Sequence, residues 1–204
     1  MPKVSQEHRD ARRQQVIEAA VVCFARQGFH RATMQDIVKQ SGLSAGAIYN
    51  YFESKEEIIE ALAKERHARE RALIVEARQQ ESLAAMVRSL VQGFFKTFAI
   101  AKERMHRSIG VQVWAEALFS PQLHRMVREG VDEPRRLLVE LISVAQKRGE
   151  IPVNLVPEAV ARVMIALFQG FVLQQAWDEE VDVGSYIEVI EVFLSSLLTI
   201  VQKG

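Results

Sequence analysis

Residues 33–55 decide the fold, and their sequence is TMQDIVKQSGLSAGAIYNYFESK. Thr33, followed by Asp36 three residues later, is typical of the capping box that begins a helix. Gly42 interrupts that helix, and the serine two residues later can cap a second short helix over residues 44–52. Two short helices joined by a tight, glycine-containing turn predict a helix-turn-helix.

The second short helix has one buried side and one free side. With Ile48 at the centre of the buried side, a rotation of about 100° per residue places Phe52 beside it and turns Tyr49 and Asn50 away. The exposed first residues, 44–46, are Ser, Ala and Gly, which let the backbone approach another surface closely. Unpaired amides at a helix N-terminus donate hydrogen bonds to phosphate, so this end can meet DNA. Small helical proteins also contain such corners without any DNA function, and the spacing alone leaves both alternatives open.

The rest of the chain predicts helices and no strands, because no region shows sustained alternation with β-branched residues. Apolar residues recur at helical spacing instead, for example Ile17, Val21 and Phe24 on one face. Besides the two short helices, we expect helices over residues 9–27, 54–80, 82–101, 104–119, 121–148, 157–175 and 185–202. Pro134 either kinks the fifth of these or separates two helices, and the sequence leaves both alternatives open. The prediction is an all-α protein of about nine helices.

The composition is that of a soluble globular protein. The chain has 204 residues, of which 49% are hydrophobic and 25% charged, and these values exclude general disorder. A chain of this size needs neither a disulfide nor a metal to stay folded, and its one cysteine, Cys23, is expected to be a small buried hydrophobe. No stretch approaches about 18 uninterrupted apolar residues, and the N-terminus lacks the apolar segment of a signal peptide. We therefore expect a cytoplasmic protein with no membrane partner.

The net charge of zero hides an uneven distribution. Residues 1–55 hold eight Lys and Arg against five Asp and Glu, a net of +3, and residues 56–204 hold eighteen against twenty-one, a net of −3. A basic head on an acidic body is typical of a protein that meets phosphate with one end.

The motifs of enzymes are missing from the sequence. It contains no glycine-rich phosphate loop, no histidines and cysteines at metal-ligand spacing, and no His-Glu-x-x-His. The acidic loop Asp178–Asp182 lacks the alternation and the glycine of a calcium loop. We expect no enzymatic activity, no metal and no cofactor.

The helix-turn-helix stretch closely resembles the DNA-binding domain of TetR/AcrR-type transcriptional regulators. The matching motifs are TMQDIV at 33–38, SGLS at 41–44, GAIYNYF at 46–52 and SK at 54–55. The resemblance covers about residues 12–70 closely and continues more weakly through 148–151 and 166–170. It implies a three-helix head over residues 1–72, joined by a long helix to a ligand-binding and dimerisation body over residues 73–204.

The resemblance also implies which residues meet DNA. Tyr49 and Lys55 resemble the phosphate contacts of the family, and a cation at the start of a helix needs a compensating negative charge in any case. Tyr51 is expected either to pack or to touch DNA, and Gln35 and Asn50 are the candidates for reading base edges. The complete predicted interface is Thr33, Gln35, Ser44, Ala45, Gly46, Tyr49, Asn50, Tyr51 and Lys55.

The body is expected to bind a small apolar or amphipathic effector, by the same resemblance, although a plain core explains most of its large side chains equally well. The predicted ligand contacts are Phe98, Met105, Arg107, Gln112, Trp114, Met164, Phe168 and Phe171. The last two helices are apolar on more than one side, which predicts a two-fold dimer interface.

The functional prediction is a repressor that binds a pseudo-palindromic double-stranded operator as a homodimer and is released by its effector. Two alternatives remain at this point: an activator of the same family, and a helical ligand-binding protein without DNA function.

Overall fold

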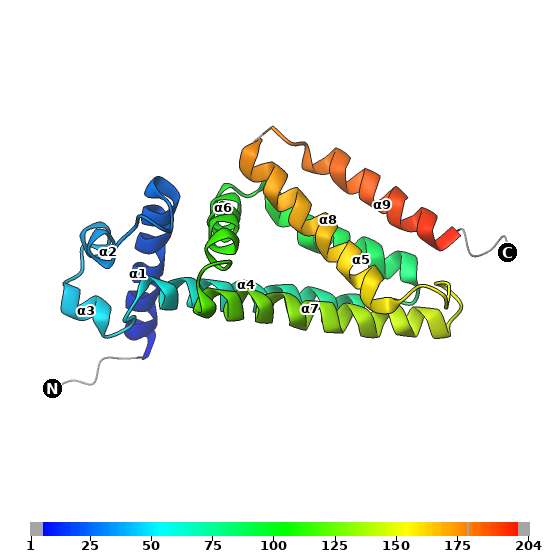
Figure 1. Ribbon diagram of the computed structural model, residues 1–204, viewed down its shortest axis with the longest axis horizontal. Helices are drawn as coiled ribbons and strands as arrows, with labels where there is room; N and C mark the ends of the chain where they lie inside the picture. The colour runs from blue at the N-terminus through cyan, green and yellow to red at the C-terminus, as the bar shows by residue number, and fades with distance from the viewer. Residues whose placement is uncertain (1–5, 179, 200–204) are drawn as a thin grey trace. The chain divides into compact units, whose positions relative to one another are not determined.

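The structure, a computed structural model, describes residues 6–178 and 180–199, without the side chains at positions 83, 99, 101, 102, 195 and 197–199. Over these residues the chain forms nine α-helices, one 3-10 turn and no strand (Figure 1), which confirms the all-α prediction. The helices are α1 (Gln6–Gln27), α2 (Met34–Ser41), α3 (Ala45–Tyr49), α4 (Lys55–Ala77), α5 (Leu83–Phe95), α6 (Ala101–Glu116), α7 (Pro121–Lys147), α8 (Pro157–Trp177) and α9 (Val183–Thr199).

Contacts within the chain divide it into two compact units. The first combines Met1–Glu65 with Met105–Val127, and the second combines Arg66–Arg104 with Arg128–Gly204. The helix-turn-helix therefore shares its unit with most of α6 and the first residues of α7. A boundary at residue 72 cuts the chain once, whereas α4, α6 and α7 each run from one unit into the other. The functional division at residue 72 stays a prediction.

The core of the first unit is built by two distant segments of the chain. Its buried side chains include Ile17, Phe24, Ile37 and Ile48 from the first segment, and Ile109, Val113 and Leu123 from the second. Burying one such side chain stabilises a fold by about 1.5–3 kcal/mol. Cys23 lies in this core, as expected, and burial raises the pKa of its thiol.

Several helix ends differ from the expected ones. α5 stops at Phe95 and continues as a 3-10 turn over Lys96–Ala99. α6 ends at Glu116, because the amides of Leu118 and Phe119 bond three residues back and tighten the chain into a turn. α9 was expected to reach residue 202, and residues 200–202 lie outside the described range.

Pro134 lies inside α7, which runs without a break from Pro121 to Lys147. The alternative of two separate helices is therefore wrong. Proline has no amide hydrogen to donate within the helix, and its ring crowds the carbonyl four positions earlier, here that of Gly130.

The centre of the second unit is aromatic. Its rings contact one another over centroid distances from 4.3 Å (Phe171 to Tyr186) to 6.0 Å (Phe95 to Phe168), many of them edge to face. Such pairs stabilise a core by more than the burial of their apolar surface alone accounts for. The full cluster is Phe94, Phe95, Phe98, Phe168, Phe171 and Tyr186.

His67 of α4 fills a narrow slot against α7. A Cβ added to Gly130 would overlap the His67 imidazole, so the absence of a side chain there permits the close approach. Burial, and to a smaller extent the nearby positive charge of Arg66, lowers the pKa of His67 to about 4. The ring is therefore neutral at neutral pH.

We expect Gly130→Ala to lower the free energy of unfolding by about 1–2 kcal/mol, because the added methyl group displaces the imidazole. In a His67→Ala background the same change should stabilise by about 0.5–1 kcal/mol, because alanine is the better helix former. Urea unfolding of the four proteins measures both values. If Gly130→Ala changes the free energy of unfolding equally in both backgrounds, the close contact between His67 and Gly130 is contradicted.

The wild type should lose stability as the pH falls from about 6.5 to about 4, because the unfolded chain binds a proton at His67 that the folded protein binds only near pH 4. His67→Ala should make this part of the pH dependence shallower, as measured by the same unfolding experiment.

Candidate nucleic-acid interface

The predicted capping box at the start of α2 is present. Thr33 has an extended backbone, and its Oγ1 accepts a hydrogen bond from the Asp36 amide at 3.2 Å. In return Asp36 Oδ2 accepts from the Thr33 amide at 3.0 Å and from the Thr33 hydroxyl at 2.7 Å. These bonds from Thr33, with another from Gln27, lower the pKa of the Asp36 carboxyl.

The capping box has a consequence for DNA binding. A hydroxyl has one proton to donate, and Thr33 donates it to Asp36. A phosphate oxygen only accepts hydrogen bonds, so a phosphate contact requires this proton to change partner. The contact of Thr33 with DNA stays a prediction.

The turn between α2 and α3 is held by hydrogen bonds within the turn and by one from α1. Gly42 has a left-handed backbone with φ 68°, which ends α2 and turns the chain. Ser41 Oγ donates to the Val38 carbonyl and accepts from the Leu43 amide. From α1, Gln15 Nε2 donates to the Ser41 carbonyl at 2.9 Å. The contacts of Ser41 and Gly42, in the turn before the first residue of α3, therefore set the direction of that helix.

α3 presents the faces that the sequence predicts. Ser44 Oγ caps it by accepting from the Ala47 amide at 3.2 Å. Ile48 is fully buried, whereas Tyr49 is 50% exposed and Asn50 is exposed beside it. Ala45 and Gly46 are exposed at the tip, and a Cβ on Gly46 would meet nothing within 4 Å.

The helix is shorter than the expected range of 44–52. It ends at Tyr49, and residues 50–52 form a turn held by bonds to the Ile48 carbonyl. This turn brings Phe52 into the core, where it is 4% exposed. Tyr51 is half-buried and packs against the same core, so packing is part of its role.

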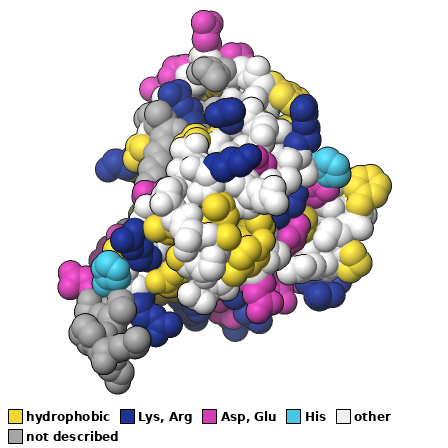
Figure 2. Space-filling view, turned by 90° about the vertical axis from the view of Figure 1, so that its left-hand side faces the viewer, with side chains coloured by type: hydrophobic (Ala, Val, Ile, Leu, Met, Phe, Trp, Pro, Cys, Tyr) yellow, Lys and Arg dark blue, Asp and Glu magenta, His cyan; other side chains and the backbone are white. Residues whose placement is uncertain are grey.

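Positive charge is distributed over the outer surface of the head. Gln35 is exposed near the start of α2, and the basic residues Arg31 and Lys39 are exposed before it and at the end of that helix. Figure 2 shows Lys and Arg side chains around an area of uncharged and hydrophobic side chains on this side of the molecule. Such a surface suits contacts to a phosphate backbone around a central, uncharged tip.

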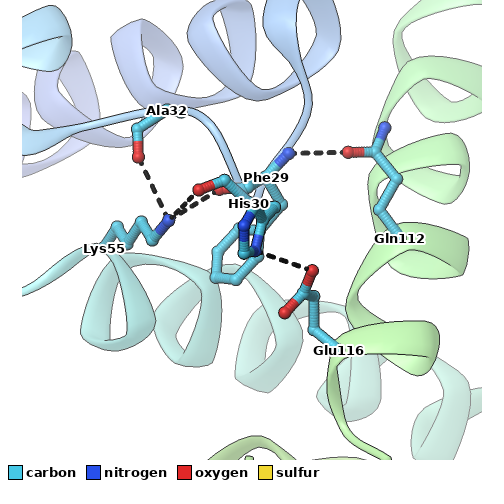
Figure 3. A network of polar contacts seen from close by, with 6 residues as sticks. All are labelled: Phe29, His30, Ala32, Lys55, Gln112 and Glu116. Carbon is cyan, nitrogen blue, oxygen red and sulfur yellow. Dashed lines mark hydrogen bonds and ion pairs between the residues drawn. The ribbon is translucent and has the colours of Figure 1, made fainter. Parts of the chain in front are cut away.

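Lys55 holds the loop between α1 and α2. Its Nζ donates to the carbonyls of Phe29, His30 and Ala32 at 2.8, 2.9 and 3.1 Å, and it lies 4.8 Å from the centre of the Phe29 ring (Figure 3). An ammonium group has three donors, and three carbonyls take them. These three partners are neutral carbonyls, so the negative charge predicted to compensate this cation, and the contact of Lys55 with phosphate, both stay predictions.

The predicted ligand residues do not form one group. Phe98, Phe168 and Phe171 meet in the aromatic cluster. The centroid of the Phe98 ring lies 5.7 Å from that of Phe168 and 4.7 Å from that of Phe171. Phe98 and Phe171 are fully buried, as core residues are. Met164 lies half-buried on α8, near Phe168 in sequence.

The remaining ligand candidates lie on α6, within the first unit. Met105 packs against the core of the head. Gln112 Oε1 accepts a hydrogen bond from the Phe29 amide at 2.7 Å. Arg107 and Trp114 are half-buried on the same helix. A role of these four residues in ligand binding stays a prediction.

Sequence reasoning missed the contacts that hold the head from a distance. Gln15 reaches a carbonyl 26 residues away, and Gln112 reaches an amide 83 residues away. Neither glutamine belongs to a local motif, so no pattern in the sequence could have indicated its partner.

Two family models match the chain. "Bacterial regulatory proteins, tetR family" matches residues 16–62, and "BetI-type transcriptional repressor, C-terminal" matches residues 85–199, more than half of the chain. Together they span the helix-turn-helix and most of the rest.

Individual relatives agree with these matches. The uncharacterised HTH-type transcriptional regulator YfiR of Bacillus subtilis is 49% identical over 57 residues, 28% of each chain. The HTH-type transcriptional regulator UidR of Escherichia coli is 26% identical over 193 residues, covering 92% of this chain and 93% of UidR. The solved structure of Salmonella enterica GusR superposes with a TM-score of 0.76 at 28% identity, over 97% of this chain and 99% of that one.

Tyr49 offers the sharpest test of the interface. We expect Tyr49→Phe to weaken DNA binding about ten-fold or more on every sequence, because it removes a hydrogen bond to a charged phosphate. Its side chain is half exposed, so the free energy of unfolding should change by less than about 0.5 kcal/mol. Fluorescence anisotropy with labelled duplexes measures the affinity, and Tyr51→Phe is the comparison for a hydroxyl nearer the core. Unchanged affinity in Tyr49→Phe would remove this tyrosine from the interface.

Proposed function

The chain belongs to the TetR family of bacterial transcriptional regulators, and we propose that it is a repressor that binds a pseudo-palindromic operator as a homodimer. A small apolar or amphipathic effector releases it, and it acts in the bacterial cytoplasm, where the DNA is. The observation that carries this proposal is the outer face of α3, where Tyr49 and the Ser-Ala-Gly tip are exposed above a fully buried Ile48.

Recognition by this face relies on the DNA backbone more than on base edges. Ala45 and Gly46 have no side chain that can hydrogen-bond a base, so beyond the Ser44 hydroxyl the tip offers only backbone groups and small surfaces. Gln35 and Asn50 are exposed and can reach donors or acceptors in the major groove. Contacts to phosphate and the shape of the DNA supply the rest of the specificity.

The homodimer is supported by α8. Ala159, Val163, Ala166 and Gly170 follow helical spacing along one side of this helix. Val163 is 49% exposed, both alanines are exposed, and a Cβ on Gly170 would meet nothing within 4 Å. A stripe of small apolar residues allows a second helix to approach closely.

α9 supplies a matching apolar surface. Val189, Val192 and Phe193 are 67%, 70% and 47% exposed and lie on one side of the helix. Ile190 and Leu194 are buried on its other side, within the second unit. A helix that is apolar on both sides needs a partner on each, and a second copy related by a two-fold axis provides the missing one.

α8 also has the length and composition of a membrane-spanning helix, with a mean hydropathy of 1.3 over its most apolar window, 22% of which is buried. That test is weak for one helix, because helices in the interior of soluble proteins pass it too. A dimer interface accounts for the same exposed apolar surface, and α8 lies within the segment matched by the repressor family model.

Release by an effector follows from differential binding. A ligand weakens DNA binding only if it prefers a conformation that fits the operator poorly, and DNA then weakens ligand binding by the same factor. Met164 and Phe168 are the half-buried members of the predicted ligand set in the second unit, and Phe168 belongs to the aromatic cluster. An apolar effector is the chemistry that these side chains favour.

The proposal is tested by selecting bound fragments of genomic DNA with the purified protein. We expect enrichment of an inverted repeat whose half-sites lie about 34–36 Å apart along the duplex, or a multiple of that distance. Addition of salt should weaken binding steeply, as for any interface that neutralises phosphates. Enrichment of no fragment at low salt would contradict DNA binding, and a site without two-fold symmetry would contradict the dimer.

Val163→Glu tests the dimer interface directly. Two-fold symmetry puts the new carboxylate into the interface from both copies, so the dimer should dissociate at least about ten-fold more readily, a loss of about 1.4 kcal/mol or more. Val153→Glu is the matched control, because Val153 is 84% exposed in the loop before α8. Sedimentation velocity over a range of concentrations measures both. A stable dimer in both variants would move the interface away from α8.

A further inference from the structure

The loop between α1 and α2 is held by side chains from two other helices. Lys55, at the start of α4, binds three of its carbonyls, and two residues of α6 approach from the other side (Figure 3). Gln112 accepts from the Phe29 amide at 2.7 Å, and Glu116 lies 3.1 Å from His30 Nδ1. Gln112 and Glu116 are one helical turn apart, so they face the loop together.

The two contacts from α6 differ in strength. The His30 side chain is 80% exposed, and an exposed ion pair contributes little to stability. Phe29 is 2% exposed, and its amide donates to Gln112 in a part-buried setting. A buried amide that loses its acceptor is costly, so of the two contacts from α6 the bond to Gln112 is the stronger one on the loop.

The backbone at Gly28 leaves space for the side chain of Gln112. Gly28 has φ 87°, a conformation that other residues rarely adopt, and it ends α1. A Cβ on Gly28 would lie 3.6 Å from Gln112 Oε1, so the amide oxygen sits directly against this bend. The adjoining Phe29 is fixed on its other sides as well, by Lys55 at its carbonyl and by Phe24 edge-on at 5.1 Å.

What Gln112 fixes is the start of the helix-turn-helix. Thr33, whose capping box begins α2, lies four positions after Phe29, and Ala32 between them is 2% exposed. The loop has little freedom over this distance, because the Ala32 amide bonds the Gly28 carbonyl at 3.1 Å. A displacement of Phe29 therefore displaces α2, and α3 with it.

We propose that Gln112 is a positioning residue for DNA binding: it keeps the recognition helix in register by holding the Phe29 amide, and loss of this bond lowers operator affinity without removing any DNA contact. The inference rests on the proposed function.

Three variants test the proposal in the full-length protein. Gln112→Met keeps the length of the side chain and removes the acceptor, whereas Gln112→Glu keeps an oxygen where the Phe29 amide can reach it. Glu116→Gln is the matched control on the same face of α6. For each protein, the rate of hydrogen exchange at the Phe29 amide is measured without DNA. The affinity for a genomic fragment that the wild type selects is then measured over a series of salt concentrations.

We expect Gln112→Met to exchange the Phe29 amide at least ten-fold faster and to bind DNA about ten-fold more weakly. The slope of log affinity against log salt should stay the same, because no phosphate contact is lost; a lost contact lowers the slope by about one unit. Gln112→Glu and Glu116→Gln should both stay within about three-fold of the wild type.

The outcomes separate this inference from the proposed function. Faster exchange with unchanged DNA affinity would make Gln112 a purely structural residue and overturn the inference, as would wild-type exchange in Gln112→Met. A reduced salt slope in Gln112→Met would also overturn it, because it would indicate a lost phosphate contact. If the wild type itself selects no DNA, the proposed function fails and this inference fails with it.

Discussion

The burial of Ile48 is the constraint on which the interface depends. α3 has five residues, too few to be stable through its own hydrogen bonds, so the helix exists because Ile48 is anchored in the core of the head. Every exposed group on its outer face takes its position from that anchor. The core and the proposed DNA-binding surface are thus two sides of the same short segment, so a substitution in the core also displaces groups on that surface.

Local signals in the sequence predicted the fold well, because their causes lie within a few residues. The capping box of Thr33 and Asp36, the serine cap of α3 and the tight turn at Gly42 all appear in the structure as expected. Helix ends were predicted less well. α6 ends three residues before the expected Phe119, since the amides of Leu118 and Phe119 bond three residues back and tighten the chain into a turn.

In the candidate site, too, the features with a local cause were predicted better than those that depend on distant residues. Angular spacing predicted that Tyr49 and Asn50 face outward, and they do. The dipole argument predicted a negative partner for Lys55, but it could not tell a phosphate from the carbonyls that lie there. The predicted ligand residues were least secure, because large apolar side chains at helical spacing look alike in a core and in a pocket. Phe98 and Phe171 are fully buried in the aromatic cluster, and Gln112 is bonded to the head.

The interleaving of the two units bears on how such regulators can be recombined. The head has its own core, but residues 105–127 contribute Ile109, Val113 and Leu123 to it. A chimera that joins residues 1–72 to the body of another regulator would exchange these three side chains for foreign ones and replace the partner of the Phe29 amide. A modular exchange would have to carry the segment 105–127 along with the head. The head that carries the proposed DNA-binding surface is therefore not confined to residues 1–72, because two separate stretches of the chain build its core.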